Sequence, residues 1–320
     1  MIYVEILGRM GNQMFSYAHA RYLQERYPEQ EIALDFTNYR NIDETWINYL
    51  QYFECADNLK VDQRRMNITQ KIMLKLFYSS RTKWKGYKEI YAHELRWARV
   101  MEWFDLYIFT NGYFPFHYKN HFKNKLLIGF FESERYFSAI RPILNKEFMV
   151  KDFEKNIFAT EIAKRINTEN CICVGVRRGD FISAENKKYC DLCRPQYFEE
   201  GVRKIKEYVE RKELRTTVRK WTIYIFTEDI SWAQNHLHFE DDVIYITSAV
   251  NGKLKPWEML HIMTLFQYYV IPNSSFFWWG QFLSKAEKPV VVAPKVWRKA
   301  DENVYQDIYE ENWILLDPVN

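Results

Sequence analysis

The stretch IYVEILGRMGNQMFSYAHARYL, residues 2–23, joins a strand pattern to a helix pattern through two closely spaced glycines. Large aliphatic side chains recur at every second position in residues 2–7, which is typical of a strand. Gly8 and Gly11 then form a turn, and the residues after them carry apolar side chains at the spacing of an α-helix. Asn12 is predicted to be the N-cap, because its side chain can accept a hydrogen bond from the first N–H groups of the helix.

The same order of strand and helix recurs along the rest of the chain. Further strands are predicted at residues 32–35, 126–131, 171–176, 221–226, 243–247, 268–271, 290–293 and 313–316. Helices are predicted at residues 12–27, 132–148, 195–212, 229–237, 256–267 and 276–285, and residues 36–125 are expected to be mostly helical. This alternation favours an α/β fold with a parallel sheet covered on both faces. A charged stretch at residues 150–168 separates two such blocks, which predicts domains at residues 1–155 and 156–320.

Composition excludes several classes of protein. Of 320 residues, 48% are hydrophobic and 18% aromatic, so the chain is neither disordered nor collagenous and can bury a sizeable core. The net charge is only +3, which does not indicate a nucleic-acid partner. No apolar run is long enough to span a bilayer, and the first residues lack the basic segment of a signal peptide. We therefore expect a cytoplasmic protein, and peripheral association with the inner membrane face is left open.

Four of the five cysteines lie close together in the sequence. Cys171 and Cys173 fall in a strand pattern that places both on one face of a sheet, and Cys190 and Cys193 form a C-x-x-C pair. A zinc site is one interpretation, and a zinc-stabilised interaction module is the function that would follow from it. We instead expect buried thiols with no metal site. A disulfide framework is also not expected, because the count is odd and no secretory signal is evident.

Polar clusters follow four of the predicted strands. They are Gly8-Arg9-Met10-Gly11-Asn12-Gln13, Arg177-Arg178-Gly179-Asp180, Thr227-Glu228-Asp229 and Pro272-Asn273-Ser274-Ser275. Ligands of open parallel sheets bind beyond the carboxyl ends of the strands. The sequence therefore predicts a ligand site that is built from these loops.

The residue types indicate an anionic ligand. Arg177 and Arg178 carry planar guanidinium groups that match phosphate oxygens. Neighbours in an extended chain point to opposite sides, so we expect one arginine to meet the ligand and the other to pair with a carboxylate such as Asp180. A purely structural Arg–Asp pair is the alternative. Ser274 and Ser275 precede a predicted helix, where their hydroxyl and N–H groups either bind a phosphate or simply cap the helix.

Other motifs narrow the chemistry. The loop Gly8-x-x-Gly11-Asn12 brings backbone N–H groups towards a ligand, but it is neither a dinucleotide fingerprint nor a P-loop. Glu228 and Asp229 can accept hydrogen bonds from a base or a ribose, or they cap the following helix. No D-x-D motif is present, so a metal-bridged diphosphate lacks its usual ligands, whereas an arginine can neutralise a leaving diphosphate.

Together, these motifs resemble the α-1,2-fucosyltransferase family. The matching segments keep their order and are GRMGNQMF (8–15), GFFESERYF (129–137), VRRGD (176–180), FTED (226–229), NSSFFWWG (273–280) and VAPKVW (292–297). The resemblance implies a GT-B-like α/β architecture, with two Rossmann-like domains facing across a cleft. It implies transfer of fucose from GDP-fucose to a galactoside hydroxyl in α-1,2 linkage, with inversion and without a metal or other cofactor. The expected acceptor is a galactose-terminated glycan or a lipid-linked saccharide.

The resemblance also implies roles for individual residues. Arg177 matches the arginine that contacts the diphosphate, and Asn12 matches a loop residue that faces the sugar phosphate. Glu228 or Asp229 matches the position near guanine or ribose. Motifs and resemblance together predict catalytic roles for Arg177 and Asn12, and donor binding by Gly11, Asn12, Gln13, Arg177, Arg178, Asp180, Glu228, Asp229, Asn273, Ser274, Ser275 and Phe276.

The general base is not fixed by the sequence. The family often has histidine two residues before its first arginine, where this chain has Gly175. Asp180, Glu132 and Glu134 are therefore the candidates for taking the proton of the acceptor hydroxyl. Half of the ten glycines lie in the matching segments, and we expect the backbone to approach a diphosphate or turn sharply there.

The acceptor side is expected within residues 36–125, which are rich in aromatic and basic side chains. Trp46, Trp84, Trp97 and Trp103 could stack on a sugar, but we expect core packing for each of them. Two other functions stay as alternatives. One is fucosyl transfer with another linkage or acceptor, and the other is binding of a nucleotide sugar without transfer.

Overall fold

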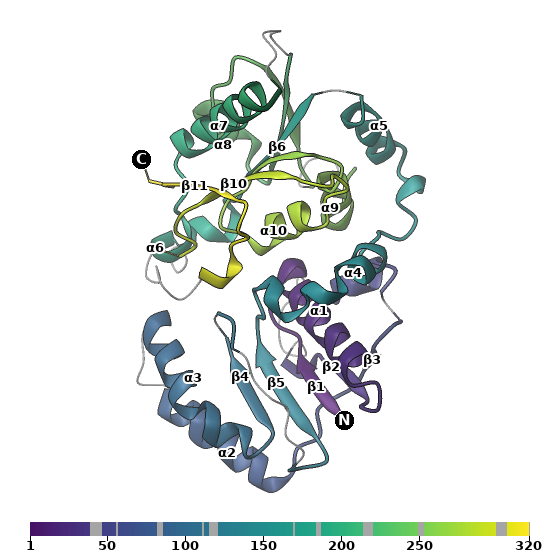
Figure 1. Ribbon diagram of the computed structural model, residues 1–320, viewed down its shortest axis with the longest axis vertical. Helices are drawn as coiled ribbons and strands as arrows, with labels where there is room; N and C mark the ends of the chain where they lie inside the picture. Colours follow the sequence, from purple (N-terminus) through teal and green to yellow (C-terminus); the bar gives the residue numbers. More distant parts are fainter. Residues whose placement is uncertain are drawn as a thin grey trace. The chain divides into compact units, whose positions relative to one another are not determined.

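The computed structural model describes residues 1–38, 47–55, 57–81, 86–110, 112–114, 121–168, 170–183, 187–213, 220–248, 253–298 and 306–319. The chain divides into two compact units, unit 1 (Met1–Met149 with Ala300–Tyr309) and unit 2 (Val150–Lys299 with Glu310–Asn320). Each unit contains one parallel sheet with helices packed on it, which confirms the predicted α/β class (Figure 1). No helix within the described ranges is long and apolar enough to cross a bilayer.

The sheet of unit 1 has five parallel strands in the order β3-β2-β1-β5-β4. The strands are β1 (Ile2–Glu5), β2 (Ile32–Asp35), β3 (Lys60–Val61), β4 (Leu106–Phe109) and β5 (Lys125–Gly129). In the central strand, Ile2 pairs with Ile32 on one side and with Lys125 on the other. Neighbours β1 and β5 are far apart in sequence, so the loops that follow them meet at the carboxyl edge of the sheet.

Helices cover the sheet of unit 1 because each presents apolar side chains to it. These helices are α1 (Met10–Arg26), α2 (Ile68–Arg81), α3 (Tyr87–Glu102) and α4 (Arg141–Glu147), with 3₁₀ turns η2 (Tyr49–Tyr52), η3 (Glu134–Tyr136), η4 (Ser138–Ile140) and η7 (Gln306–Ile308). Phe77 of α2 and Met101 of α3 join one buried cluster with Tyr3 and Ile128 of the strands. Most of α1 is also buried.

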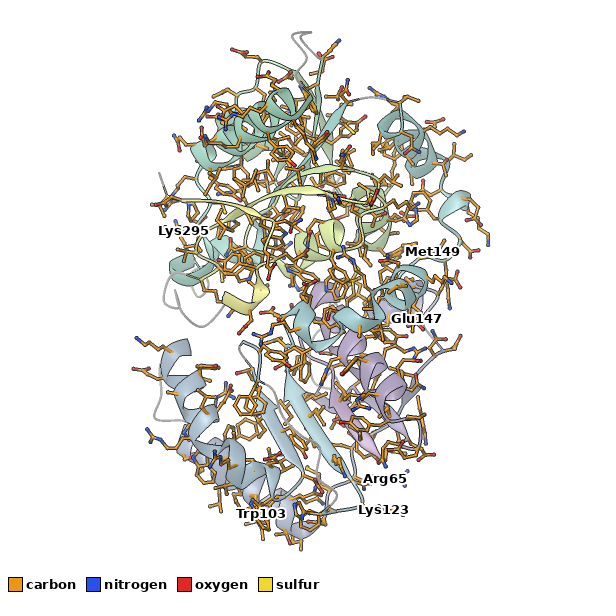
Figure 2. The ribbon with its side chains drawn as sticks, viewed as in Figure 1. Arg65, Trp103, Lys123, Glu147, Met149 and Lys295 are labelled. Carbon is orange, nitrogen blue, oxygen red and sulfur yellow. The ribbon has the colours of Figure 1, made fainter. Side chains whose placement is uncertain are left out.

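Unit 1 closes at the end of α4. The backbone N–H groups of Glu54 and Cys55 donate to the carbonyls of Met149 and Glu147, both at 2.9 Å. The Glu147 carboxylate also accepts from Tyr17 Oη at 2.6 Å. Figure 2 shows Glu147 and Met149 at this point. These bonds tie the last helix of the unit to the segment that follows η2, so unit 1 ends as a closed piece of structure.

The sheet of unit 2 has six parallel strands in the order β11-β10-β9-β6-β7-β8. The strands are β6 (Cys171–Val176), β7 (Thr222–Thr227), β8 (Asp242–Ile246), β9 (Tyr268–Val270), β10 (Val290–Pro294) and β11 (Ile314–Leu316). The chain builds outward from β6 first on one side and then on the other, which is the order of the classical dinucleotide-binding sheet. The helices are α5 (Ile157–Ile166), α6 (Lys187–Cys190), α7 (Pro195–Glu213), α8 (Ile230–His236), α9 (Pro256–Met263) and α10 (Ser275–Phe282), with 3₁₀ turns η5 (Phe153–Lys155) and η6 (Gly179–Ile182).

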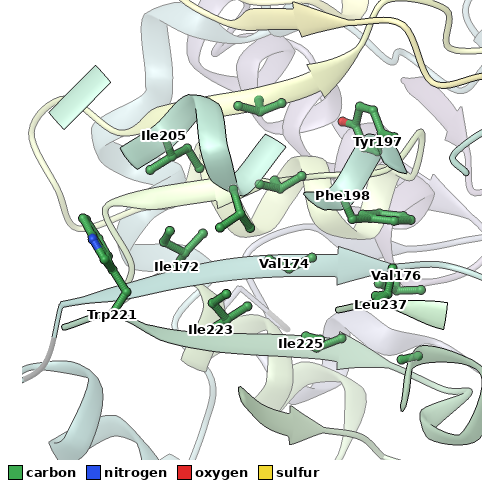
Figure 3. Close-up of a cluster of buried hydrophobic side chains, with 14 of the residues drawn as sticks. Ile172, Val174, Val176, Tyr197, Phe198, Ile205, Trp221, Ile223, Ile225 and Leu237 are labelled. Atoms are coloured by element: carbon green, nitrogen blue, oxygen red, sulfur yellow. The ribbon is translucent and has the colours of Figure 1, made fainter. Parts of the chain in front are cut away.

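Alternation along β6 sorts its side chains between the two faces of the sheet. Ile172, Val174 and Val176 belong to a buried cluster with Tyr197 and Ile205 of α7 (Figure 3). Cys171 and Cys173 occupy the odd positions and are buried. Side chains one residue apart in a strand point to opposite faces, so both cysteines lie on the face away from α7. That they share one face is what the sequence predicted.

Several local predictions were wrong. Helix α1 begins at Met10 with Arg9 as its N-cap, so Asn12 lies inside the first turn. Residues 132–148 form two 3₁₀ turns and the short α4 instead of one helix. The stretch at residues 36–125 contains β3 and β4 besides its helices. Strand β3 has only two residues, too few for a period to appear in the sequence.

The two units also differ from the predicted domains in their bounds. Unit 1 ends at Met149, and the segment Ala300–Tyr309 returns to it from the C-terminal part of the chain. The return is held by Asp307, whose carboxylate accepts from Tyr113 N at 3.0 Å and from Arg135 Nη1 at 2.6 Å. Contacts between residues that are so far apart in the chain cannot be predicted from local sequence patterns.

Of the four tryptophans considered for the acceptor, two lie in the described part of the chain. Trp97 packs edge-on against Phe77, with 6.2 Å between ring centroids, which confirms core packing for it. Trp103 has 62% of its surface exposed, so the expected core role was wrong there. Trp46 and Trp84 lie outside the described residues.

Candidate functional site

Strand order places a crevice in unit 2 at the carboxyl ends of β6 and β9. These strands are neighbours, but the chain continues from β6 towards β7 and from β9 towards β10, so their loops diverge. The structure has a pocket at this point. It is lined by Val176, Arg177, Arg178, Cys190, Asp191, Leu192, Cys193, Phe198, Trp232, Pro272 and Asn273. Two of the four predicted loops, those after β6 and β9, therefore meet as expected.

Glu228 organises the loop after β6. Its Oε1 lies 3.3 Å from Arg177 Nη1 and accepts from the backbone N–H of Arg178 at 2.9 Å. A Cβ on Gly179 would lie only 2.6 Å from the same oxygen, so glycine lets the carboxylate sit against the backbone. The Arg177 side chain is 24% exposed, which leaves it accessible to a ligand in the crevice. The loop after β7 is thereby joined to the loop after β6.

Arg178 pairs with a different carboxylate from that of Arg177. Its Nε lies 3.3 Å from Asp229 Oδ2, and its guanidinium lies over the Trp232 ring at 4.3 Å from the centroid. Asp229 therefore takes the place that the sequence assigned to Asp180, whose side chain lies outside the described part of the structure. Oδ1 of Asp229 also caps α8 by accepting from Trp232 N at 3.0 Å.

Asn273 joins three segments of the chain at the crevice by hydrogen bonds of its side chain. It is 5% exposed, and its Nδ2 donates to the carbonyls of Cys190 and Trp297, both at 3.0 Å. Its Oδ1 accepts from Cys193 Sγ at 3.8 Å. These hydrogen bonds use both the nitrogen and the oxygen of the side-chain amide within unit 2. Asn273 therefore fixes the wall of the pocket, where the sequence predicted it to bind the donor.

Helix α10 begins at the edge of the crevice. Ser274 is its N-cap residue, but the side chain makes no capping hydrogen bond, and Ser275 is the first helical residue. The backbone N–H groups of the first turn therefore point out of the helix beside Asn273, with the positive end of the helix dipole. Phe276 is half-buried and packs edge-on against Phe277. This arrangement suits an anion placed between the helix and Arg177.

Glycines at the site make room for other protein groups. A Cβ on Gly175 would clash with the Phe277 ring of α10, and a Cβ on Gly280 would lie 3.1 Å from Met263 Cβ. These contacts and that of Gly179 with Glu228 are packing contacts within unit 2. The expectation that glycines mark backbone approach to a diphosphate does not describe these positions, because the groups they accommodate belong to the protein.

The predicted residues Gly11, Asn12 and Gln13 lie in unit 1, in the first turn of α1 beyond β1. Gly8 has φ of 65°, and the Asn12 side chain packs over it. Gln13 is fully buried, and its amide donates to Ile47 O at 2.9 Å and accepts from Tyr49 N at 2.8 Å. Its side chain thus fixes the segment before η2, whereas Asn12 is half-buried and is the more accessible polar side chain of the turn.

The candidate bases Glu132 and Glu134 follow β5, next to the turn after β1. Glu132 is 6% exposed, and Phe131 before it has a left-handed backbone with φ of 52°. Glu134 is half-buried and is the first residue of η3. Both carboxylates therefore belong to the carboxyl edge of the sheet of unit 1, where parallel sheets bind ligands.

A carboxylate that the sequence did not single out lies beyond β4. Glu94 of α3 accepts from Thr110 N at 3.0 Å and from Thr110 Oγ1 at 2.5 Å, and Arg81 Nη1 lies 4.0 Å away. Burial raises the pKa of Glu94 to about 7, and its hydrogen bonds from Thr110 only partly offset this effect. A glutamate within an amphipathic helix gives no sequence signal that distinguishes it from a solvated one.

The cysteines form no metal centre among the residues that the structure describes. No group of three or more His, Cys, Asp or Glu side chains in those ranges could hold an ion. Cys190 and Cys193 instead line the pocket, and neither forms a disulfide within the described residues. Burial raises the pKa of Cys193 to about 12, so it stays protonated at neutral pH. The C-x-x-C pair thus contributes to the pocket wall, a role that sequence reasoning missed.

Comparison with known proteins agrees with this geometry. The model of Glycosyl transferase family 11 matches residues 1–317. The O-antigen biosynthesis glycosyltransferase WbnK from Escherichia coli is 26% identical over 327 residues, which cover 98% of this chain and 100% of WbnK. An α-1,2-colitosyltransferase from Escherichia coli is 27% identical over 194 residues, 59% of this chain and 62% of that protein. A galactoside 2-α-L-fucosyltransferase from Caenorhabditis elegans is 24% identical over 171 residues, 50% and 43% of the two chains.

A solved structure supports the fold. Fucosyltransferase NodZ from Bradyrhizobium superposes with a TM-score of 0.50 over 88% of this chain and 93% of NodZ, at 10% sequence identity. At this identity the likeness concerns the fold alone, and it confirms the GT-B-like class expected for two Rossmann-like units. The alignments also show that this chain spans less than two thirds of the colitosyltransferase and of the nematode enzyme.

Proposed function

Because the chain belongs to glycosyltransferase family 11, we propose that it transfers fucose from GDP-fucose to the 2-hydroxyl of a galactoside, with inversion and without a metal ion. The observation that carries the proposal is the position of Arg177. It lies at the switch point of a sheet with the classical nucleotide-binding order, beside the first turn of α10. A diphosphate is the ligand that such a cation and helix N-terminus suit together.

The reaction we propose is a single displacement. The acceptor oxygen forms a bond to the anomeric carbon of fucose while the bond from that carbon to the diphosphate oxygen breaks. The electron pair leaves with GDP, and the acceptor proton passes to a base. Arg177 would stabilise the charge that grows on the diphosphate, with Glu228 holding the guanidinium in place. An arginine supplies this charge as part of the chain, which is why we propose that no metal is needed.

The donor-binding assignment rests on the residues that meet in unit 2. Arg177, Arg178, Glu228 and Asp229 form two ion pairs at the mouth of the crevice, and Ser274, Ser275 and Phe276 form the start of α10. Asp180 follows in the same loop. In unit 1, Gln13 is fully buried and bonded within its own unit, so of the residues predicted there only Asn12 is kept for the donor. We propose that Asn12 acts on the sugar phosphate, because its side chain is the accessible one of its turn.

The relatives support the acceptor class. The name of the nematode relative gives a galactoside as its acceptor. The name of WbnK places that enzyme in O-antigen biosynthesis. We therefore propose a galactose-terminated glycan or a lipid-linked saccharide as acceptor, in a protein that works in the cytoplasm. The colitosyltransferase relative favours a second candidate function, α-1,2 transfer of colitose from its nucleotide sugar.

The test is a transfer assay on the whole chain. GDP release is measured with GDP-fucose alone, with a terminal β-galactoside, and with the galactoside plus EDTA, and the product linkage is read by NMR. We expect release only when the galactoside is present, unchanged by EDTA, with an α-linked fucose on O2. Binding of GDP-fucose with no release for any galactoside would favour a non-catalytic protein. A different linkage, or a preference for the colitose donor, would replace the proposed specificity.

A further inference from the structure

Helix α2 presents a row of large apolar side chains to solvent. Ile68, Ile72 and Leu76 are 71%, 52% and 50% exposed, respectively. Residues four apart lie one above another on a helix, so the three side chains form one continuous stripe. A helix on the surface of a globular unit normally turns such a stripe towards the core. In α2 the core is instead contacted by Phe77, so this stripe has no partner within the described part of unit 1.

The start of α2 is held in a corner of unit 1 by hydrogen bonds. The side-chain amide of Gln70, 1% exposed, donates to Phe104 O at 2.9 Å and to Asn124 O at 2.8 Å. Asn124 in turn donates from Nδ2 to Arg65 O at 2.8 Å. These bonds join the start of α2, the end of α3 and the start of β5. The surface of this corner is therefore fixed by buried polar contacts.

The corner brings another exposed apolar side chain beside the stripe. Trp103 follows α3 directly, next to the Phe104 carbonyl that Gln70 binds, and its ring stacks on His121 with 5.1 Å between centroids. Figure 2 shows Trp103, Arg65 and Lys123 at the same end of unit 1. The exposed tryptophan thus lies beside the exposed apolar stripe, and basic side chains surround both. Together they form an amphipathic surface.

The exposed charged side chains of α2 and α3 are mostly positive. They are Lys71, Lys75, Lys88, Arg96 and Arg99, against the single carboxylate Glu89. Glu89 is already bonded to the N–H of Gly86 at 2.7 Å. The surface therefore combines apolar side chains with an excess of positive charge, although the chain as a whole is nearly neutral.

We propose that this surface docks on the headgroup region of a bilayer that contains anionic lipids. The α2–α3 surface, as we call it, comprises Ile68, Lys71, Ile72, Lys75, Leu76 and Trp103. Isoleucine, leucine and tryptophan bury into the boundary between headgroups and acyl chains, and lysines reach anionic phosphates from their flexible stems. A second copy of the chain fits less well, because a two-fold contact would place these lysines against one another.

The test is vesicle flotation of the full chain. Vesicles of phosphatidylcholine with phosphatidylglycerol, in about a 2:1 ratio, are compared with vesicles of phosphatidylcholine alone at low and high salt. We expect the protein to float with the anionic vesicles, and binding to weaken with salt. The pair Ile72→Glu with Leu76→Glu should lower binding more than tenfold. The pair Lys71→Glu with Lys75→Glu should lower it by about fivefold or more per lysine, because each basic residue contributes on that scale near an anionic surface.

The control variant is Ile157→Glu. Ile157 is 72% exposed on α5 of unit 2, so the same chemical change is made away from the α2–α3 surface. Circular dichroism checks that every variant is folded. Equal binding to both vesicle types, or equal loss in the Ile157 variant, would overturn the proposal. So would concentration-dependent self-association that the Ile72 and Leu76 substitutions abolish, because the surface would then be an interface between copies.

Discussion

The side-chain amide of Asn273 donates hydrogen bonds to two backbone carbonyls beside the crevice. It holds Cys190 O and Trp297 O from one amide nitrogen. We expect Asn273→Ala to lower the free energy of unfolding by about 1–3 kcal/mol, because two hydrogen bonds that contribute about 0.5–1.5 kcal/mol each are lost. Chemical denaturation measures the change. Asn235→Ala, at an exposed position of α8, is the matched control and should change little, and equal stability of both variants would contradict this role for Asn273.

A second residue-scale prediction concerns pH. The pKa of Glu94 is raised by burial from 4.5 to about 7, so between these values the folded chain binds more protons than the unfolded chain. The resulting stability is fully present below pH 4.5 and is lost as pH rises through 7. Raising pH from 5 to 8 should therefore lower the free energy of unfolding by on the order of 2 kcal/mol more in the wild type than in Glu94→Gln.

Urea denaturation at the two pH values checks the Glu94 prediction. The control is Glu161→Gln, which changes an exposed glutamate of α5 and should keep the wild-type pH dependence. If Glu94→Gln loses stability with pH as the wild type does, the carboxyl does not titrate in this range. The comparison between variants cancels the buried histidines, since burial lowers the pKa of His19 to about 3 and that of His261 to about 4 in all of them.

The sequence predicted residue types at the site better than residue partners. It placed Arg177 and Arg178 at a strand end and expected one of them to pair with a carboxylate. The partner of Arg178 is Asp229, because the loop after β7 reaches the loop after β6 across neighbouring strands. Such a pairing depends on which strands are adjacent in the sheet, and the order of strands cannot be predicted from a local stretch of sequence. The same reason explains why Trp232 was missed, whereas Glu94 was missed because a buried glutamate of an amphipathic helix looks like a solvated one in the sequence.

At the scale of elements, Gly175 sets how closely α10 packs on β6. A Cβ there would clash with the Phe277 ring, so the ring or the helix must move. We expect Gly175→Ala to lower the free energy of unfolding by about 1–3 kcal/mol, as overpacking in a core commonly does. Donor affinity should also fall, because α10 begins just after Asn273, which lines the crevice.

The control for Gly175 is Gly280→Ala on α10 itself. A Cβ at Gly280 would lie 3.1 Å from Met263 Cβ, which a shift of a few tenths of an ångström relieves, and Met263 Sδ and Cε at 3.3 Å can move away by a change of rotamer. This variant should lose less than about 1 kcal/mol and bind GDP as the wild type does. Chemical denaturation and GDP titration measure the stability and the GDP affinity of the two variants. Equal effects of both substitutions would show that the Phe277 contact does not fix the position of α10.

Regular elements with strong patterns were predictable, and irregular ones were not. The strands β6, β7 and β10 carry continuous apolar runs, since both faces of the sheet are covered, and each was found within a residue or two. The region after β5 breaks into η3, η4 and α4, where Phe131 adopts a positive φ that no sequence pattern requires. Helix α1 began earlier than its expected cap because Arg9 takes that position without a side-chain bond.

At the scale of the whole molecule, the C-terminal part of the chain returns to unit 1 through Asp307. Its carboxylate binds Arg135 Nη1 and Tyr113 N, and the Arg135 guanidinium also lies 4.0 Å from the centroid of the Tyr113 ring. We expect Asp307→Ala to lower the free energy of unfolding by about 1 kcal/mol, because the pair is partly exposed. Glu311→Ala, exposed and outside this contact, serves as the control in the same denaturation series. Equal stability of the two variants would mean that Asp307 does not hold the return segment.

The fold class and the family could be predicted from the sequence because the motifs keep their order over most of the chain. The expected acceptor region could not be interpreted in the same way. Its helices α2 and α3 expose apolar residues that a surface helix would ordinarily turn towards the core. Trp103 shows this most clearly, since an aromatic side chain in an apolar stretch is ordinarily a core residue.

The central claim is that Arg177 stabilises the diphosphate of a nucleotide-sugar donor in the crevice of unit 2. The direct measurement is the rate of GDP-fucose turnover with a galactoside for Arg177→Ala, Arg177→Lys and the control Arg194→Ala, whose side chain is 50% exposed in the same unit. We predict a loss of ~10²–10³ in kcat for Arg177→Ala, partial recovery with lysine and near-normal turnover for Arg194→Ala. A folded Arg177→Ala variant that turns over GDP-fucose at the wild-type rate would contradict the claim.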